Sequence, residues 1–256
     1  MTNERRVLVH NDRAALAASL AARFLTKVVD LLDQKQRVNV VLEGGRVAMD
    51  VLRQVNENPA RDSVDWSRVH FWWGDERFVP TGDAERNDAK ARDALLDHID
   101  VPASNIHPMP AADGELSLDD AAAAYEAELR ANPDGDLGMP RFDITFLGVG
   151  PDGHTASLFP EHPEVLEKDA LVLPVRNSPK PPPERITLTR PALNSSRRIW
   201  VEIAGADKAS SLGLALAGAA YSEVPIAGIK GRRRTVFFVD REAAAEVPEN
   251  LISQSY

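Results

Sequence analysis

The sequence predicts an α/β fold with a doubly wound, mostly parallel sheet that carries helices on both faces. Segments typical of strands alternate along the chain with segments typical of helices, which is the order that βαβ units produce. Several strand segments are apolar throughout, as expected for strands covered on both faces. The 256 residues show no internal repeat and no convincing linker, so residues 1–256 are expected to form a single domain.

The helical segments share apolar residues at helical spacing. The first, residues 12–34, is rich in alanine and leucine with charges at its edges, and Asn11 or Asp12 is a candidate N-cap. Four further helices are expected at residues 46–57, 84–99, 118–131 and 207–218.

The strand segments are rich in β-branched and aromatic residues. They lie at residues 37–45, 68–78, 141–150, 185–205 (two strands around a turn) and 234–240. Three of them end at glycines, after Leu42, Trp73 and Leu147. Because ligands of open parallel sheets bind at the carboxyl ends of strands, we expect the functional site beside these glycines.

Composition limits the classes of function. The chain has no cysteine, which excludes disulfides, thiolate metal ligands and a cysteine nucleophile. The net charge of −9 argues against non-specific nucleic-acid binding. A few local cations can still bind a small anion, because cellular salt screens distant charges over about 8 Å. No secretory signal and no apolar run of roughly 20 residues is visible, so we expect a cytoplasmic protein without a membrane partner.

The segment FDITFLGVGPDGHTASLFPEHP has two interpretations. Its GVGPDG portion matches the glycine pattern of a dinucleotide-binding turn. Such a site needs a proper helix after the glycines, but Pro160 and Pro163 interrupt any helix here. It also needs an acidic residue about 20 positions further on, and the sequence there, LVLPV, has none. We therefore reject a dinucleotide site.

The same segment then forms a turn that presents a histidine at the mouth of a strand. Pro151 fixes φ, Asp152 suits a turn and Gly153 permits positive φ. A neutral imidazole is a suitable general base near pH 7, so His154 is a candidate catalytic residue with Asp152 beside it. On the local pattern alone, a structural role for His154 as a helix cap is an equal alternative.

The chain resembles the 6-phosphogluconolactonase family, within the glucosamine-6-phosphate isomerase/6-phosphogluconolactonase superfamily. Four segments are similar to that family's blocks, in the family's order and over nearly the whole chain: WGDERFVP, GVGPDGHTASLFP, SPKPPPERITLT and GADKASSL. The related glucosamine-6-phosphate deaminases carry Asn-Glu-Pro after the histidine, where this chain has SLFP, which favours the lactonase.

The resemblance implies a NagB/RpiA/CoA-transferase-like fold and a carboxylic ester hydrolase. Its expected reaction converts 6-phospho-D-glucono-1,5-lactone to 6-phospho-D-gluconate in the oxidative pentose phosphate pathway, with no organic cofactor and no obligatory metal. We hypothesise that His154 takes a proton from the attacking water and returns it to the ring oxygen. Asp152 would orient the imidazole or bind sugar hydroxyls. No GxSxG is present, so a serine nucleophile has no support.

The substrate's phosphate is expected to bind to cations and backbone N–H groups. The candidates for substrate or phosphate binding are Gly44, Gly45, Asp75, Arg77, Lys180, Arg185 and Lys208. Among the cations, the resemblance favours Arg77, Lys180 and Lys208 as phosphate contacts ahead of Arg185. For each single cation, the alternative is a solvated surface position, the commoner fate of Lys and Arg. For Asp75, the alternatives are to fix Arg77, to hold a hydroxyl, or to form an ordinary salt bridge.

Position 43 departs from the family, which has Ser or Thr before the two glycines. The carboxylate of Glu43 would repel a phosphate, so we expect it to turn away, to pair with Arg46, or to weaken the phosphate site. If the phosphate site is weakened, the chain could be a catalytically weakened sugar-phosphate-binding protein instead of an active lactonase. The enzymatic alternative is a glucosamine-6-phosphate deaminase or a sugar-phosphate isomerase. The oligomeric state has no signature in the sequence, and we expect a monomer.

Overall fold

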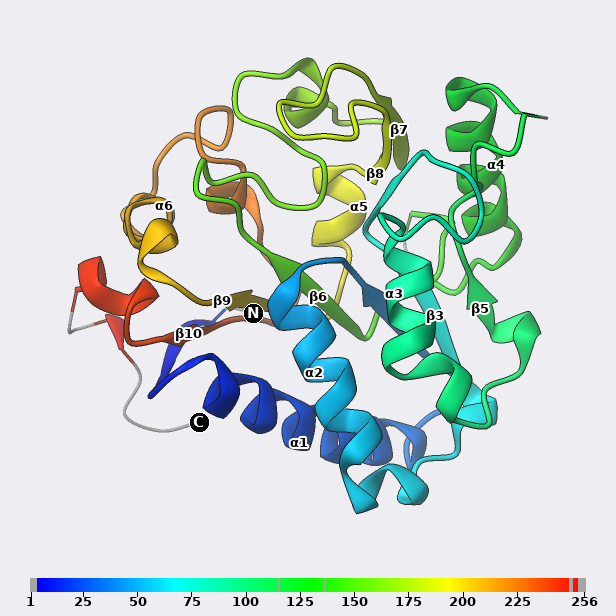
Figure 1. Ribbon diagram of the computed structural model, residues 1–256, viewed down its shortest axis with the longest axis horizontal. Coiled ribbons are helices and arrows are strands. Elements are labelled where there is room, and N and C mark those ends of the chain that lie inside the picture. The colour runs from blue at the N-terminus through cyan, green and yellow to red at the C-terminus, as the bar shows by residue number, and fades with distance from the viewer. Residues whose placement is uncertain (1–3, 115, 136, 249–250, 253–256) are drawn as a thin grey trace.

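The computed structural model describes residues 4–114, 116–135, 137–248 and 251–252. Its centre is a seven-stranded sheet of order β1-β10-β9-β6-β2-β3-β5, in which all neighbouring strands are parallel. These strands are β1 (Glu4–His10), β2 (Val38–Leu42), β3 (Val69–Trp73), β5 (Ile106–His107), β6 (Ile144–Gly148), β9 (Arg198–Ile203) and β10 (Arg234–Asp240). The predicted α/β fold with a doubly wound sheet is confirmed (Figure 1).

A small antiparallel sheet of order β4-β8-β7 lies beside the carboxyl ends of the main sheet. Its strands are β4 (Asp75–Arg77), β7 (Val172–Val175) and β8 (Arg185–Leu188). Gly74 joins the two sheets: its N–H donates to Leu42 O at 2.9 Å, and its carbonyl accepts from Leu188 N at 2.8 Å. The ends of β2 and β8 are therefore fixed to the same residue.

The helices follow the predicted order. They are α1 (Arg13–Leu32), α2 (Arg46–Glu57), α3 (Asn87–Ala94), α4 (Leu118–Ala131), α5 (Arg190–Asn194) and α6 (Ala209–Leu216). Asp12 caps α1 as expected, since its side chain accepts from Ala15 N at 2.8 Å. Helices α1 and α2 pack against each other, and α4 covers the small sheet (Figure 1). In the part of the chain that the structure describes, no helix is long and apolar enough to span a membrane.

The core explains why the central strands are apolar throughout. Every residue of β2 is buried, and Trp72, Trp73 and Trp200 are among the largest fully buried side chains. Burial on both faces favours continuous runs of large apolar residues, because each face must be covered. The strand order β9-β6-β2-β3 places the carboxyl ends of four adjacent strands at one edge of the sheet.

The structure also differs from the predicted elements. The sequence analysis missed β1, β5 and β7, and it extended α3 over residues 84–99. The helix α3 ends earlier because Leu95 leaves the helical conformation. Between β8 and β9 the chain forms the short helix α5 where a simple turn was predicted; Pro191 stands in its first turn and Thr189 caps it.

Candidate functional site

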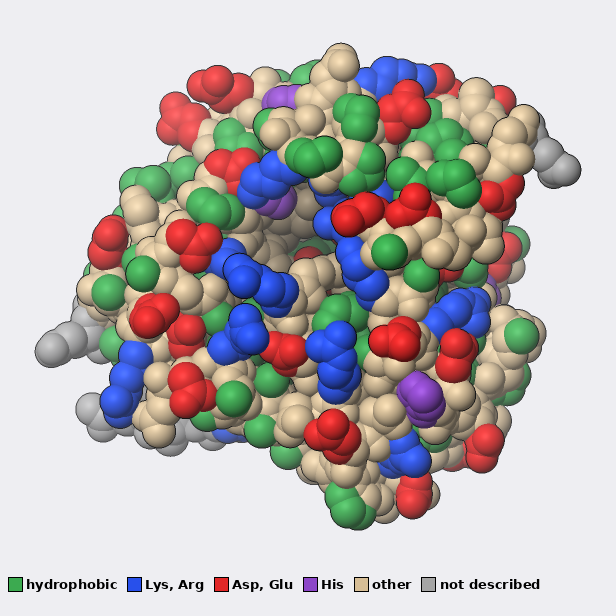
Figure 2. Space-filling view, in the orientation of Figure 1, with side chains coloured by type: hydrophobic (Ala, Val, Ile, Leu, Met, Phe, Trp, Pro, Cys, Tyr) green, Lys and Arg blue, Asp and Glu red, His purple; other side chains and the backbone are tan. Residues whose placement is uncertain are grey.

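A pocket of about 340 Å³ opens at the carboxyl ends of β2, β6 and β9 and of the short strand β4. Figure 2 shows it as a hollow ringed by Lys and Arg side chains, with a His at its edge. All three glycine-bearing strand ends singled out in the sequence contribute to this region. The cations that line the pocket are Arg13, Arg46, Arg77, Lys180, Arg185 and Lys208. A chain of net charge −9 therefore has a locally cationic pocket.

His154 lines this pocket, on the turn that follows β6. Its Nδ1 lies 2.5 Å from Asp152 Oδ1, so the neutral ring donates from Nδ1 and keeps the lone pair on Nε2. Among the described residues, Nε2 has no hydrogen-bond partner. The turn is tight: a Cβ on Gly150 would stand 2.0 Å from His154 Nδ1 and 2.5 Å from Asp152 Oδ1. Only glycine leaves room for the pair.

Asp152 stands behind the imidazole rather than on the wall of the pocket. Lys180 Nζ lies 3.4 Å from His154 Nδ1 and 3.7 Å from Asp152 Oδ1. Burial alone would raise the pKa of Asp152, but the hydrogen bond from His154 and the charges of His154 and Lys180 outweigh it and lower the pKa to about 2. Of the two roles considered for Asp152, its position favours orienting the imidazole.

The turn between β2 and α2 supplies backbone donors. Gly45 is the N-cap of α2 with φ of 112°, and no side chain caps the helix. The residues from Gly44 to Ala48 line the pocket, so the free N–H groups of the first turn of α2 face it. Gly44 has to be glycine for steric reasons, because a Cβ there would lie 2.0 Å from Asn87 Oδ1. This end of α2 is suited to an anion.

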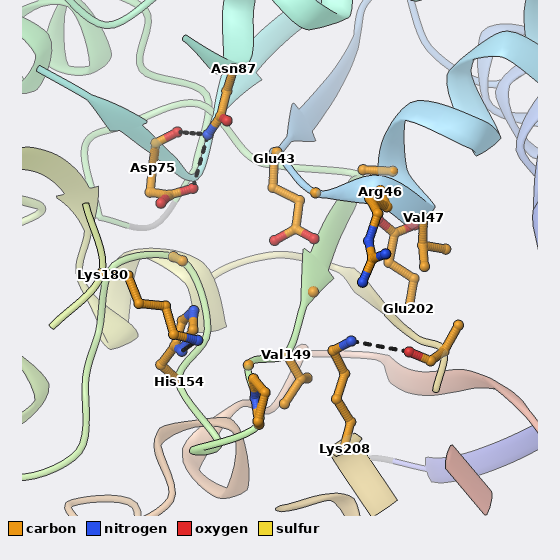
Figure 3. A pocket seen from close by; sticks show the side chains of 18 of the residues that line it. Glu43, Arg46, Val47, Asp75, Asn87, Val149, His154, Lys180, Glu202 and Lys208 are labelled. Carbon is orange, nitrogen blue, oxygen red and sulfur yellow. Dashed lines mark hydrogen bonds between the residues drawn. The ribbon is translucent and has the colours of Figure 1, made fainter. Parts of the chain in front are cut away.

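Arg46 and Lys208 stand on the opposite side of the pocket from His154 and Lys180 (Figure 3). Within the described ranges Arg46 forms no ion pair, and its expected pairing with Glu43 is absent. Lys208 Nζ donates to Ala204 O at 3.0 Å and lies 3.6 Å from Asp207 Oδ1. From the sequence, Arg46 was proposed only as a partner of Glu43. Its position as the first residue of a predicted helix, directly after two glycines, could have indicated that it lies beside the ligand pocket.

Arg77 and Arg185 are held by the chain around them. Arg77 Nη1 donates to Glu85 O at 2.7 Å, while its buried Nε has no partner among the described residues. Arg185 belongs to β8, not to the proline-rich loop before it. From there it donates to the carbonyls of residues 180–182 and so braces that loop, which carries Lys180.

Asp75 does not fix Arg77, contrary to one of the expectations from the sequence. It accepts a hydrogen bond from Ser157 Oγ at 2.7 Å and lies 4.0 Å from Arg185 Nη1. Asn87 Nδ2 lies 3.4 Å from Asp75 Oδ1. Ser157 is fully buried, and its Oγ donates to Asp75 and not to His154, so nothing among the described contacts activates it as a nucleophile.

Glu43 neither turns away from the pocket nor pairs with Arg46. Its carboxyl points into the pocket between His154 and Arg46 (Figure 3). It is only 5% exposed, and Glu202 of β9, also in the pocket wall, is 3% exposed. Burial, and then the charge of Glu202, raises the pKa of Glu43 well above its usual range. Burial raises the pKa of Glu202 to about 8. The sequence analysis missed Glu202 entirely.

Apart from Asp152, all the site residues predicted from the sequence line the pocket: Gly44, Gly45, Asp75, Arg77, His154, Lys180, Arg185 and Lys208. The described residues contain no cluster of three or more His, Asp or Glu side chains that would hold a metal ion. The pocket therefore offers one oriented imidazole, several cations and a free helix N-terminus around one space.

Comparison with known proteins finds the same architecture. The family model for glucosamine-6-phosphate isomerases/6-phosphogluconolactonase matches residues 11–238. A 6-phosphogluconolactonase of Streptomyces coelicolor is 46% identical over 255 residues, which are 98% of each chain. That of Mycobacterium leprae is 43% identical over 94% of this chain and 98% of its own. The solved structure of the 6-phosphogluconolactonase of Thermotoga maritima matches with a TM-score of 0.80 at 31% identity. The match covers 93% of this chain and 100% of that chain.

Proposed function

The chain belongs to the family of glucosamine-6-phosphate isomerases and 6-phosphogluconolactonases, and we propose that the pocket around His154 is its active site. The enzyme is a 6-phosphogluconolactonase, a hydrolase that converts 6-phospho-D-glucono-1,5-lactone to 6-phospho-D-gluconate in the oxidative pentose phosphate pathway. The observation that carries the proposed site is the geometry of His154: Asp152 holds its Nδ1, and Nε2 remains available in a cationic pocket.

The proposed reaction begins with a water molecule between Nε2 of His154 and C1 of the lactone. Nε2 accepts a proton from the water as its oxygen attacks C1, and the carbonyl oxygen takes up the negative charge of the tetrahedral intermediate. The bond between C1 and the ring oxygen then breaks, and the imidazolium returns the proton to that oxygen. Asp152 stabilises the imidazolium, because it remains ionised at neutral pH. General acid–base assistance of this kind is worth about 10² to 10⁴ in rate.

The phosphate is proposed to bind at the N-terminus of α2. The N–H groups after Gly45 have no side-chain cap, Arg46 has no ion-pair partner among the described residues, and Lys208 lies on the same side of the pocket. Backbone donors and cations together suit a phosphate dianion. The sugar portion and the reacting ester would then be contacted by Lys180, Arg77 and Asp75.

The test is to measure acid release from freshly generated lactone, with spontaneous hydrolysis subtracted, and ammonia release from glucosamine 6-phosphate in parallel. We expect activity on the lactone alone, and a fall in kcat of about 10² to 10⁴ for His154→Ala with a smaller change in substrate binding. His98→Ala, an exposed histidine outside the pocket, is the matched control. A His154→Ala enzyme with unchanged kcat would refute the site, and ammonia release would favour the deaminase.

We further propose that the enzyme works in the cytoplasm as a monomer without a nucleic-acid partner. The net charge of −9 supports the last of these points, since nucleic acids attract proteins with a broad positive field. Sedimentation of the purified protein measures the oligomeric state directly.

A further inference from the structure

Glu43 and Glu202 meet across the end of β6. Glu43 directly follows β2, and Glu202 lies in β9 opposite Gly148 of β6, the strand between them. A Cβ on Gly148 would stand 2.5 Å from Glu43 Oε1, so the absence of a side chain there gives the Glu43 carboxyl its path. Both carboxyls line the pocket and are nearly inaccessible to solvent. They form a buried pair on the wall of the proposed active site.

The pair has few donors: the backbone N–H of Gly148 acts on the carboxyl of Glu43. Among the described residues, no group donates a hydrogen bond to Oε1 of Glu43 or to either carboxyl oxygen of Glu202. A buried carboxylate normally has several such donors, because losing its bound water without replacement is strongly unfavourable. The arrangement is therefore unsuited to two ionised carboxylates.

The charged groups around the pair do not compensate two negative charges. Asp75 of β4 faces Glu43, and Asp50 of α2 acts on Glu202; both are acidic and raise the two pKa values further. Arg13 of α1 is held by Asp50 at 3.0 Å. The remaining cations of the pocket, Arg46, Arg77, Lys180, Arg185 and Lys208, make no salt bridge with either glutamate in the described part of the chain. A single proton held between the two carboxyls is the simplest compensation.

We propose that Glu43 and Glu202 are specificity-determining residues that share one proton and with it hydrogen-bond an uncharged hydroxyl of the bound sugar. This rests on the proposed function of the pocket. A protonated carboxyl both donates and accepts hydrogen bonds, whereas a carboxylate only accepts them. The shared proton thus halves the negative charge of the pair and weakens its repulsion of a phosphorylated ligand.

The proposal predicts a definite dependence of binding on pH. Below the apparent pKa of the pair, the proton is present and the ligand binds. Above it, the free pair carries a second negative charge, so an anionic ligand binds only after a proton is taken up. The dissociation constant should rise with pH there, by up to about tenfold per pH unit.

The shared proton can be detected without substrate. The infrared spectrum of the wild-type protein at pH 7 should contain the carbonyl stretch of a protonated carboxylic acid, shifted in D₂O. Glu43→Gln and Glu202→Gln should each weaken it, whereas the contribution of Glu76, whose pKa burial raises to about 7, should persist. Glu57→Gln, at the exposed end of α2, is the control that should leave the band unchanged. If the band is absent from the wild type, or is unchanged in both pocket variants, the shared proton is refuted.

The contact with the sugar is tested by calorimetry with 6-phosphogluconate, the product, in buffers of different ionisation enthalpy. Between pH 7 and pH 9 the wild-type affinity should fall at least about tenfold, and about one proton should be taken up per ligand at the upper end. Glu202→Gln and Glu43→Gln should each reduce the fall in affinity and the proton uptake, because glutamine does not titrate. Equal proton uptake in wild type and both variants would overturn the proposal.

Failure of this inference is distinguishable from failure of the proposed function. Lactone hydrolysis by the wild type together with pH-independent product binding would refute the role of the pair and leave the lactonase in place. An absence of both lactone hydrolysis and product binding would refute the proposed function and the sugar contact with it, whereas the infrared band reports on the proton alone.

Discussion

Gly150 leaves the space that the proposed catalytic pair, His154 and Asp152, occupies. The imidazole of His154 and the carboxylate of Asp152 both lie over its Cα, and either would collide with a Cβ. The methyl group of Gly150→Ala should push the ring from its position and separate it from the lactone. Because a displacement of about 1 Å can cost about 10² in rate, we expect kcat to fall by that order with a smaller change in KM.

The matched control for this substitution is Gly213→Ala. Gly213 lies within α6, and its added Cβ would make only ordinary contacts, the nearest at 3.5 Å. The measurement is steady-state hydrolysis of the lactone together with a thermal melt. A Gly150→Ala enzyme that melts like the wild type and keeps its kcat would show that the ring does not need its present position.

Lys208 allows the phosphate contact to be separated from contacts with the sugar. Lys208→Glu should raise KM for the phosphorylated lactone about ten- to hundredfold, since hydrogen bonds to charged groups contribute about 1.5–3 kcal/mol. It should change KM for the unphosphorylated lactone far less. Lys230→Glu, at an exposed position outside the pocket, is the control. Equal effects on both lactones would remove Lys208 from the phosphate site.

The sequence indicated which residues line the pocket better than it indicated their partners. His154 could be proposed because a rigid turn and a strand end are local features, and the lysines and arginines because they stand in recognisable blocks. Glu202 was missed because its importance depends on β9 lying beside β6, which sequence alone does not reveal. The state of Glu43 could not be predicted for the same reason, since its partner, Glu202, lies far away along the chain.

At the level of elements, the start of α3 is positioned by β4. Glu76 of β4 accepts hydrogen bonds from Asn87 N at 2.7 Å and Asp88 N at 2.9 Å, so its carboxylate caps a helix that has no cap of its own. Asn87 in turn touches Gly44 and donates to the Asp75 carbonyl. The helix thereby links two strand ends in the pocket wall.

The contact between β3 and β5 contains a pair of histidines whose charging should loosen it. His70 Nδ1 lies 3.0 Å from His107 Nε2, and the His107 ring stacks on Trp72. Burial, with the nearby charge of Arg37, lowers the pKa of His70 to about 4. Unfolded histidine binds a proton near pH 6.5, so between pH 6.5 and pH 4 the unfolded chain binds more protons than the folded one. Stability should therefore fall as the pH is lowered from 6.5 to 4.

His70→Gln should make the loss of stability between pH 6.5 and pH 4 shallower, because glutamine does not titrate. The measurement is the free energy of unfolding in urea at several pH values, and His98→Gln is the control at an exposed histidine. An unchanged slope in His70→Gln would show that this histidine pair does not couple folding to pH.

Long, apolar elements were predictable and short or polar ones were not. The bounds of α2 and α4 agree with the predicted segments because amphipathic spacing is visible over several turns. The strand β5 has two residues, too few for any periodicity. β7 contains Pro174, which argues against a strand in the sequence, and β1 is an edge strand with three charged residues. These strands depend on their neighbours rather than on their own composition.

At the scale of the whole molecule, an acidic protein gathers six of its 30 Lys and Arg side chains around one pocket. The net charge of −9 repels an anionic substrate at long range, and the lining cations attract it at short range. Salt screens exposed charges over about 10 Å at 0.1 M and about 3 Å at 1 M. We expect kcat/KM for the phosphorylated lactone to fall as salt is raised over this range, while kcat changes little.

The unphosphorylated lactone is the control for this salt dependence, because it carries no charge for the pocket to attract. A salt series on both lactones with the same enzyme preparation gives the comparison. If kcat/KM for the two compounds falls in parallel, the effect comes from the protein itself and the lining cations do not guide the substrate.

Gly74 has a further consequence for how the pocket works. Its two peptide groups tie β2 of the large sheet to β8 of the small one, so the wall that carries Glu43 and the wall that leads to Lys180 are anchored at one point. The distance between these two walls is then set before the sugar binds, so binding needs little reorganisation of the backbone. We therefore expect the backbone around the pocket to have nearly the same conformation with and without bound sugar.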